Sequence, residues 1–210
     1  GIRGGSATVH FPIWHQEIQD ILVLKNNKGT EDNRVRKLDY SIQISKLFYE
    51  RFISNEDITL FSPHDVPGLY DAFGTDDFDK LYKQYESDES IPRTTIGGQE
   101  LILELLKERA ETGRIYIMNI DHCNSHSSFL DKVEMSNLCQ EITLPTKPIQ
   151  HIDDKSGEIA LCILSAINVG KIRDASDFEV LCDLSVRSLD ELIDFQGYPV
   201  NAAEIATRAR

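Results

Sequence analysis

Residues 99–120, QELILELLKERAETGRIYIMNI, place a helical pattern directly before a short apolar strand. Five apolar residues recur at helical spacing along one face of the first part: Leu101, Ile102, Leu105, Leu106 and Ala110. Gly113 suits the left-handed residue that often ends a helix, and Ile115–Ile120 is then a candidate strand. A helix followed at once by a strand is typical of an α/β fold.

The same alternation extends over the rest of the chain. Further helices are predicted over Phe11–Leu24, Thr30–Ile53, Asp76–Tyr85 and Asp174–Phe195, with another beginning near Ala202. Strands are predicted over Ile58–Phe61 and Ile159–Leu164, and the second is a continuous apolar run, typical of a strand covered on both faces. This order of elements predicts an α/β fold with largely parallel pairing, as a layered sheet or a barrel.

Composition excludes several classes of protein. Hydrophobic residues make up 40% and charged residues 27% of the 210 residues, which is globular composition. The net charge of −13 is opposite to that of a nonspecific nucleic-acid coat or an anionic-membrane binder. No apolar run approaches the ~18–20 residues that cross a bilayer. Four cysteines are too few for a disulfide scaffold, so we expect a reducing cytoplasmic location.

The two ends of the sequence suggest a larger protein. The first residues, GIRGG, would begin within a loop, and residues 202–210 read as a helix in its first turns. No Ser- or Pro-rich linker and no repeat of 20–50 residues divides the chain. We therefore interpret residues 1–210 as one partial domain without a complete boundary of its own.

The sharpest local feature is Ser136–Glu141, SNLCQE. If Asn137–Leu144 is extended, the side chains of Asn137, Cys139 and Glu141 share one face, with successive members roughly 6.5–7 Å apart. An amide, a thiol and a carboxylate in one row could meet a small polar molecule. The alternative is a polar strand edge that contains a cysteine.

The other candidate ligands have structural interpretations. Cys162 lies within the apolar run Ile159–Leu164 and Cys182 on the apolar face of the last long helix, so both read locally as core residues. His122, Cys123 and His126 could bind zinc, but no second pair of ligands stands at zinc spacing, and a loop with capping side chains is favoured. No metal site is therefore expected.

The glycine-rich start could contact a nucleotide. Glycine lets a backbone approach a ligand closely, and Arg3 could pair with a phosphate or stack on a base. The segment matches neither the P-loop nor the dinucleotide-binding fingerprint.

Six segments in this order resemble the catalytic large (alpha) subunit of class I, class Ia-like ribonucleotide reductases. They are Gly1–Gly5, Leu22–Gly29, Ile58–Asp65, Arg114–Ile117 with Asp121–Asn124, Ser136–Glu141 and Gly157–Cys162. The resemblance covers essentially the whole chain. It implies part of a ten-stranded α/β barrel, an internal portion that lacks the N-terminal regulatory domain and the C-terminal half of the barrel.

The resemblance also implies roles for individual residues. Cys139 matches the finger-loop cysteine that becomes a thiyl radical and removes the 3′-hydrogen of the ribose. Glu141 matches the carboxylate that takes the 3′-hydroxyl proton, and Asn137 matches the amide that binds the sugar. Cys162 matches one of two thiols that reduce the 2′-position and end as a disulfide. This match replaces the core interpretation of Cys162.

The start of the chain has a counterpart as well. Arg3, Gly4 and Gly5 match the loop that passes the identity of the effector to the substrate base. Cys182 has no counterpart and stays a predicted core residue.

The implied partners follow the family. The chain is expected to bind no cofactor itself. A small metal-containing subunit would supply the radical, and ATP, dATP, dTTP or dGTP would act as effectors of the full subunit. Further expected partners are ribonucleoside diphosphates, a second copy of the full subunit, and thioredoxin or glutaredoxin as reductant, with no direct contact to nucleic acid or membrane.

Two alternatives remain open. The chain could be a split or degenerate segment with only a structural role in a larger assembly. It could also be a stand-alone thiol redox protein that uses Cys139 and Cys162, although it lacks the C-x-x-C motif. In the reductase interpretation the isolated 210 residues are expected to be inactive.

Overall fold

The computed structural model describes residues 4–209. The chain divides into two units, Gly1–Leu144 and Pro145–Arg210. The first unit contains both sheets and most of the core, and the second contains two helices joined by irregular segments. Arg3 lies outside the described residues.

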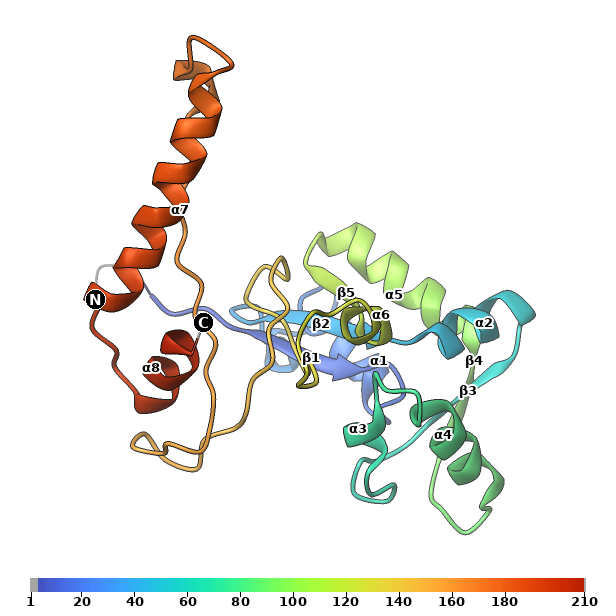
Figure 1. Ribbon diagram of the computed structural model, residues 1–210. Helices are drawn as coiled ribbons and strands as arrows, with labels where there is room; N and C mark the ends of the chain where they lie inside the picture. Colours follow the sequence, from blue (N-terminus) through green and yellow to red (C-terminus); the bar gives the residue numbers. More distant parts are fainter. Residues whose placement is uncertain (1–3, 210) are drawn as a thin grey trace. The chain divides into compact units, whose positions relative to one another are not determined.

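Three parallel strands form the main sheet of the first unit (Figure 1). In spatial order they are β1 (Thr8–Pro12), β2 (Asp39–Ile44) and β5 (Ile115–Asn119). The register aligns His10 of β1 with Ser41 of β2, and Ser41 with Tyr116 of β5. The parallel pairing confirms the predicted α/β class, and β5 confirms the strand predicted at Ile115–Ile120.

The two faces of this sheet differ in polarity. Alternate residues of a strand point to opposite faces, so Tyr40, Ile42 and Ile44 of β2 lie on one face. Ser41 and Gln43 lie on the other face and are also buried, with exposed fractions of 0% and 2%. A sheet with polar side chains buried on one face needs hydrogen-bonding partners there.

Helices and a two-stranded sheet complete the first unit. They are α1 (Ile18–Leu22), a 3-10 turn at Glu31–Asn33, α2 (Lys46–Ser54), β3 (Asp57–Leu60), α3 (Leu69–Ala72), α4 (Phe78–Ser87), β4 (Thr94–Gly97), α5 (Gly98–Thr112) and α6 (Ile120–Ser125). β3 and β4 pair antiparallel. Gly113 has φ +64° and ends α5 as predicted. The predictions at Ile58–Phe61, Asp76–Tyr85 and Gln99–Thr112 are confirmed within a few residues.

Two predicted helices are wrong. Phe11–Leu24 is instead the end of β1, a turn and the short α1, because Phe11 and Pro12 continue the parallel pairing of β1 with β2. Thr30–Ile53 contains the strand β2 followed by α2. Tertiary pairing with both neighbouring strands overrides the weak helical pattern there.

Aromatic rings fill the core between α2, α3 and α4. Phe48 meets Tyr82 edge to face at 5.4 Å between ring centroids, and Phe73 lies 4.6 Å from Phe78. The Tyr82 hydroxyl donates to Thr59 O at 2.6 Å and accepts from Thr59 N at 2.9 Å. Burial raises the pKa of Tyr82, so its hydroxyl stays protonated and continues to donate at neutral pH.

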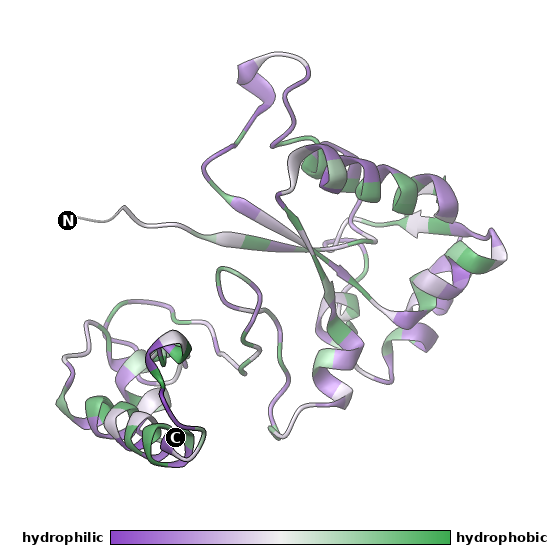
Figure 2. Ribbon diagram, turned by 90° about the horizontal axis from the view of Figure 1, so that it is seen from above, coloured by the Kyte–Doolittle hydropathy of each residue, from purple (hydrophilic) through white to green (hydrophobic). Residues whose placement is uncertain are grey.

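The second unit is organised by helices. They are a 3-10 turn at Val169–Lys171, α7 (Asp177–Phe195) and α8 (Asn201–Arg208). α7 confirms the helix predicted at Asp174–Phe195, but none of its residues is buried, so the predicted core position of Cys182 is wrong. Figure 2 shows hydrophobic and hydrophilic residues side by side in the helices near the C-terminus. No helix in the described part of the chain is long and apolar enough to cross a membrane.

The predicted strand at Ile159–Leu164 is also wrong. These residues are irregular, and Leu164 is 76% exposed. A strand covered on both faces needs paired neighbours, and among the described residues no strand pairs with this run.

Tyr82→Phe is expected to reduce the free energy of unfolding by about 1–3 kcal/mol, because both backbone groups of Thr59 lose a buried partner. Urea unfolding can be followed by the fluorescence of Trp14, the only tryptophan and fully buried. Tyr85→Phe is the matched control, since its hydroxyl donates to Pro67 O at an exposed position. Equal losses in the two variants would contradict this account.

Candidate active site

The segment that carries Cys139 lies against the polar face of the main sheet. It follows α6 and appears in yellow beside β1 and β2 in Figure 1. The Gln43 side chain donates through Nε2 to Glu134 O at 2.6 Å, and Thr8 Oγ1 donates to Leu138 O at 2.6 Å. Side chains of two strands therefore hold the backbone of this segment.

Cys139 lies in a tight turn. Gln140 N donates to Asn137 O at 3.1 Å, and Gln140 has φ +64°, in the left-handed region. Beyond the turn, Asn137 N donates to Ile142 O at 3.2 Å, so the chain folds back on itself. The thiol of Cys139 is exposed at the tip.

The predicted extended row is therefore wrong at its centre. Asn137, Cys139 and Glu141 do not alternate along a straight strand, because the side chain of Asn137 competes with strand pairing for the backbone. Its Oδ1 accepts from Ile142 N at 3.0 Å and from Ser136 Oγ at 3.2 Å. The three residues remain within one turn and its flank.

The same contacts orient the amide of Asn137. A backbone N–H can only donate, so the atom facing Ile142 N is the amide oxygen. The Nδ2 group then has no protein partner among the described residues. It is available to donate to a ligand, as the predicted role requires.

Ionisable groups gather around the turn. Partial burial raises the pKa of Tyr116 on β5, and the acidic groups of Cys139, Asp39 and Glu141 raise it further. Glu141 is exposed beside the turn. A neutral phenol, a thiol and a carboxylate therefore occupy one end of the polar sheet face.

A cavity of about 370 Å³ opens beside the turn. It is lined by Ile117, Met118, Asn119, His122, Cys123, His126, Gln140 and Thr143. The predicted polar loop at Asp121–Ser128 is mostly the helix α6, with the rings of His122 and His126 5.6 Å apart. Within residues 4–209 no group of three or more His, Cys, Asp or Glu side chains is placed to hold a metal ion.

Residues 1–210 match the family described as "Ribonucleotide reductase, barrel domain". The chain belongs to this family. It is 57% identical to the ribonucleoside-diphosphate reductase subunit alpha of Haemophilus influenzae and 44% identical to that of Enterobacteria phage T4; each alignment covers 100% of this chain and 28% of the relative. It is also 56% identical to the ribonucleoside-diphosphate reductase 1 subunit alpha of Escherichia coli, over 71% of this chain and 20% of the relative.

The other residues predicted from the resemblance to ribonucleotide reductases lie apart in the chain. Cys162 is exposed in an irregular segment of the second unit. Gly4 and Gly5 are exposed at the start of the described chain, with nothing within 4 Å of the position of an added Cβ. Their predicted roles, and that of Arg3, stay predictions.

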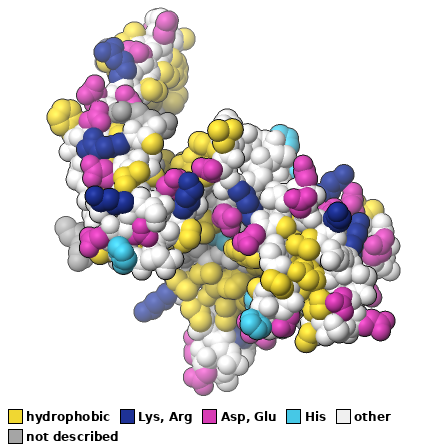
Figure 3. Space-filling view, turned by 60° about the horizontal axis from the view of Figure 1, so that its bottom comes forward, with side chains coloured by type: hydrophobic (Ala, Val, Ile, Leu, Met, Phe, Trp, Pro, Cys, Tyr) yellow, Lys and Arg dark blue, Asp and Glu magenta, His cyan; other side chains and the backbone are white. Residues whose placement is uncertain are grey.

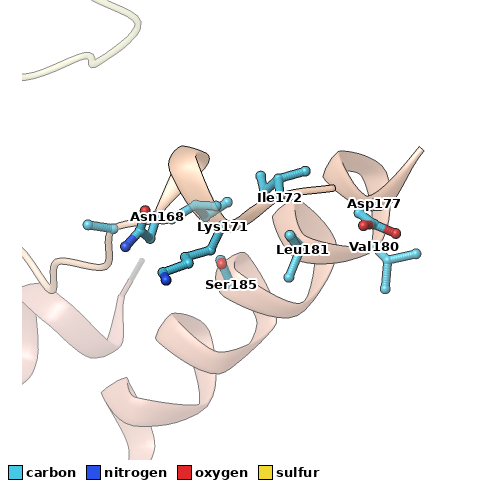
Figure 4. A pocket seen from close by; sticks show the side chains of 9 residues that line it. Asn168, Lys171, Ile172, Asp177, Val180, Leu181 and Ser185 are labelled. Carbon is cyan, nitrogen blue, oxygen red and sulfur yellow. The ribbon is translucent and has the colours of Figure 1, made fainter. Parts of the chain in front are cut away.

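The second unit has a groove of its own, with a volume of about 560 Å³ (Figure 4). Asn168 and Lys171 line one side of it, and Val180, Leu181 and Ser185 of α7 line the other. It contains none of the residues that match the reductase motifs, so it is not the predicted site.

Sequence reasoning missed the residues that hold the turn. Ser41 and Gln43 lie in β2, which was predicted as part of a helix, and Thr8 begins β1 at a position for which no element was predicted. No role was predicted for Gln140, between Cys139 and Glu141. The signal in the sequence is weak, namely polar residues alternating with apolar ones in Tyr40–Ile44.

His10→Phe is expected to reduce the destabilisation caused by acid. Burial lowers the pKa of His10, and a hydrogen bond with the backbone of Ser136 partly opposes this lowering. The unfolded chain therefore takes up this proton near its ordinary pKa of about 6.5 before the folded chain does. Stability falls as pH drops below that value.

The measurement is urea unfolding at pH 7.5 and 5.5, followed by Trp14 fluorescence. His64→Phe, at an exposed position, should leave the acid-induced loss of stability nearly unchanged. A loss in His10→Phe as large as in the parent chain would refute the role of His10.

Proposed function

We propose that this chain forms part of the catalytic subunit of a ribonucleoside-diphosphate reductase, which converts ribonucleoside diphosphates into 2′-deoxyribonucleoside diphosphates for DNA synthesis. The observation that carries the proposal is the turn at Cys139, held on the three parallel strands of the main sheet and flanked by Asn137 and Glu141. The chain spans 28% of the length of the Haemophilus influenzae and phage T4 relatives, whose names state this activity. The proposal therefore concerns the whole subunit.

The proposed chemistry begins at the sulfur of Cys139. A thiyl radical there takes the hydrogen atom from C3′, which forms an S–H bond and leaves a carbon radical. Glu141 accepts the proton of the 3′-hydroxyl, as a carboxylate within hydrogen-bond reach can do. The 2′-hydroxyl takes a proton from one of two reducing thiols and leaves as water, and Glu141 later returns its proton to the 3′-oxygen.

Two thiols supply the electrons for this loss. Cys162 and a partner thiol would give two electrons and two protons and end as a disulfide. The overall balance is ribonucleotide plus two thiols to deoxyribonucleotide, disulfide and water. Return of the hydrogen atom from Cys139 to C3′ restores the radical.

The environment of the turn suits substrate binding but needs further cover. The free Nδ2 of Asn137 can donate to a sugar hydroxyl. Cys139 and Glu141 are exposed, and a sulfur radical in open solvent would be quenched. We infer that other barrel segments of the subunit cover the turn, and that these 210 residues alone do not turn over.

The proposed partners follow from this chemistry. A small metal-containing subunit would generate the radical, thioredoxin or glutaredoxin would reduce the disulfide, and two copies of the full subunit would form a dimer. ATP, dATP, dTTP and dGTP would act as effectors through the loop of Arg3, Gly4 and Gly5. Figure 3 shows basic side chains interspersed with acidic ones on one face of the molecule. The proposed enzyme is cytoplasmic and contacts neither nucleic acid nor membrane directly.

Cys139→Ser in the full subunit is expected to lower CDP reduction to below about one thousandth of the parent rate, because serine cannot form the radical. Nucleotide binding, measured by equilibrium dialysis, should stay within twofold. Cys182→Ser is the control, since this thiol is exposed on α7. Near-normal turnover by Cys139→Ser would defeat the proposed function.

A further inference from the structure

Both neighbours of Cys139 are tied to the main sheet. On one side, Leu138 O accepts from Thr8 Oγ1 of β1 at 2.6 Å. On the other, the Gln140 carboxamide accepts from Ser41 Oγ of β2 at 2.5 Å and donates through Nε2 to Ile117 O of β5 at 2.5 Å. Each of the three parallel strands thus contributes one contact, and Cys139 lies between them.

The backbone of Gln140 is in a conformation that its side chain does not favour. A φ of +64° brings Cβ close to the backbone, and glycine adopts it with less strain. Glycine, however, could reach neither strand. The carboxamide compensates for the backbone conformation because it makes two hydrogen bonds across adjacent strands.

The carboxamide orientation is fixed by its partners. A backbone carbonyl only accepts, so Nε2 must face Ile117 O and Oε1 must face Ser41. Ser41 is 0% exposed, so loss of Oε1 would leave a buried hydroxyl without its acceptor. The turn and the strand therefore depend on each other.

We propose that Gln140 is a positioning residue for Cys139. It holds the thiol of Cys139 at a fixed distance from the sheet, where the sulfur is placed for hydrogen-atom transfer. The proposal rests on the proposed function, in which Cys139 carries the radical. Reaction between the sulfur and C3′ requires close approach, and a displacement of about 1 Å can cost a hundredfold in rate. The hydrogen bonds of Gln140, the residue next to Cys139, control the distance between the sulfur and C3′ without any contact to the substrate.

The test uses Gln140→Met in the full subunit, assayed with the radical-generating subunit and a reductant. Methionine keeps the length of the side chain and removes both hydrogen bonds. With CDP we expect kcat to fall between about ten- and a hundredfold while KM stays within twofold. With CDP deuterated at C3′, the isotope effect on kcat should increase, because hydrogen transfer becomes slower relative to the other steps.

Gln99→Met is the matched control. Gln99 also donates through Nε2 to a backbone carbonyl, Phe52 O, at 3.2 Å, but it lies on α5 away from the turn. It should change neither kcat nor the isotope effect.

The outcomes separate the two proposals. An unchanged kcat in Gln140→Met, or a fall in kcat with an unchanged isotope effect, would overturn the role of Gln140. If Gln140→Met does not fold, Ser41→Ala removes one of the two contacts and should show a smaller increase in the isotope effect, whose absence would overturn the role as well. Activity in Cys139→Ser, measured in parallel, would instead defeat the proposed function.

Discussion

The burial of Ser41 and Gln43 on one face of the main sheet is the constraint on which the arrangement of this unit depends. Buried polar side chains require hydrogen-bond partners. The loss of such a partner destabilises the fold by more free energy than the hydrogen bond contributes when it forms. Both partners come from the segment after α6, as Gln140 for Ser41 and the backbone of Glu134 for Gln43. The sheet therefore specifies where that segment runs, at two points along its length.

This constraint explains how an exposed thiol can still be well placed. The contacts to β1 and β2 are made by the neighbours of Cys139, while its exposed thiol has a hydrogen bond with the Tyr116 side chain of β5. Its neighbours carry the structural contacts, including a left-handed Gln140 that would otherwise be disfavoured. Because the neighbours of Cys139 hold the turn in place, the thiol can be well positioned and still be reactive.

The same polar residues explain which parts of the fold could be predicted. The helix and strand of Gln99–Ile120 were recognisable, because their apolar residues follow one period each. In β2 both faces are buried, one with apolar and one with polar side chains. Because Ser41 and Gln43 are polar, the segment did not read as a buried strand, and β2 was predicted as part of a helix. The motif SNLCQE drew attention to this segment, but the geometry of its turn depends on contacts to Thr8, Ser41 and Ile117, which lie 20 or more residues away in the sequence.

Cys139 and Cys162 differ in what their local structure needs. The turn at Cys139 is held by strands of its own unit, so its conformation follows from residues within this chain. The apolar run around Cys162 has strand composition but no strand beside it among the described residues, and Leu161 and Leu164 are 40% and 76% exposed. Local propensity alone does not form a strand buried on both faces, because its stability comes from packing against neighbours. The thiol of Cys162, the proposed reductant, therefore requires neighbouring strands before it can take a defined position. The thiol of Cys139, the proposed site of the radical, already has a defined position.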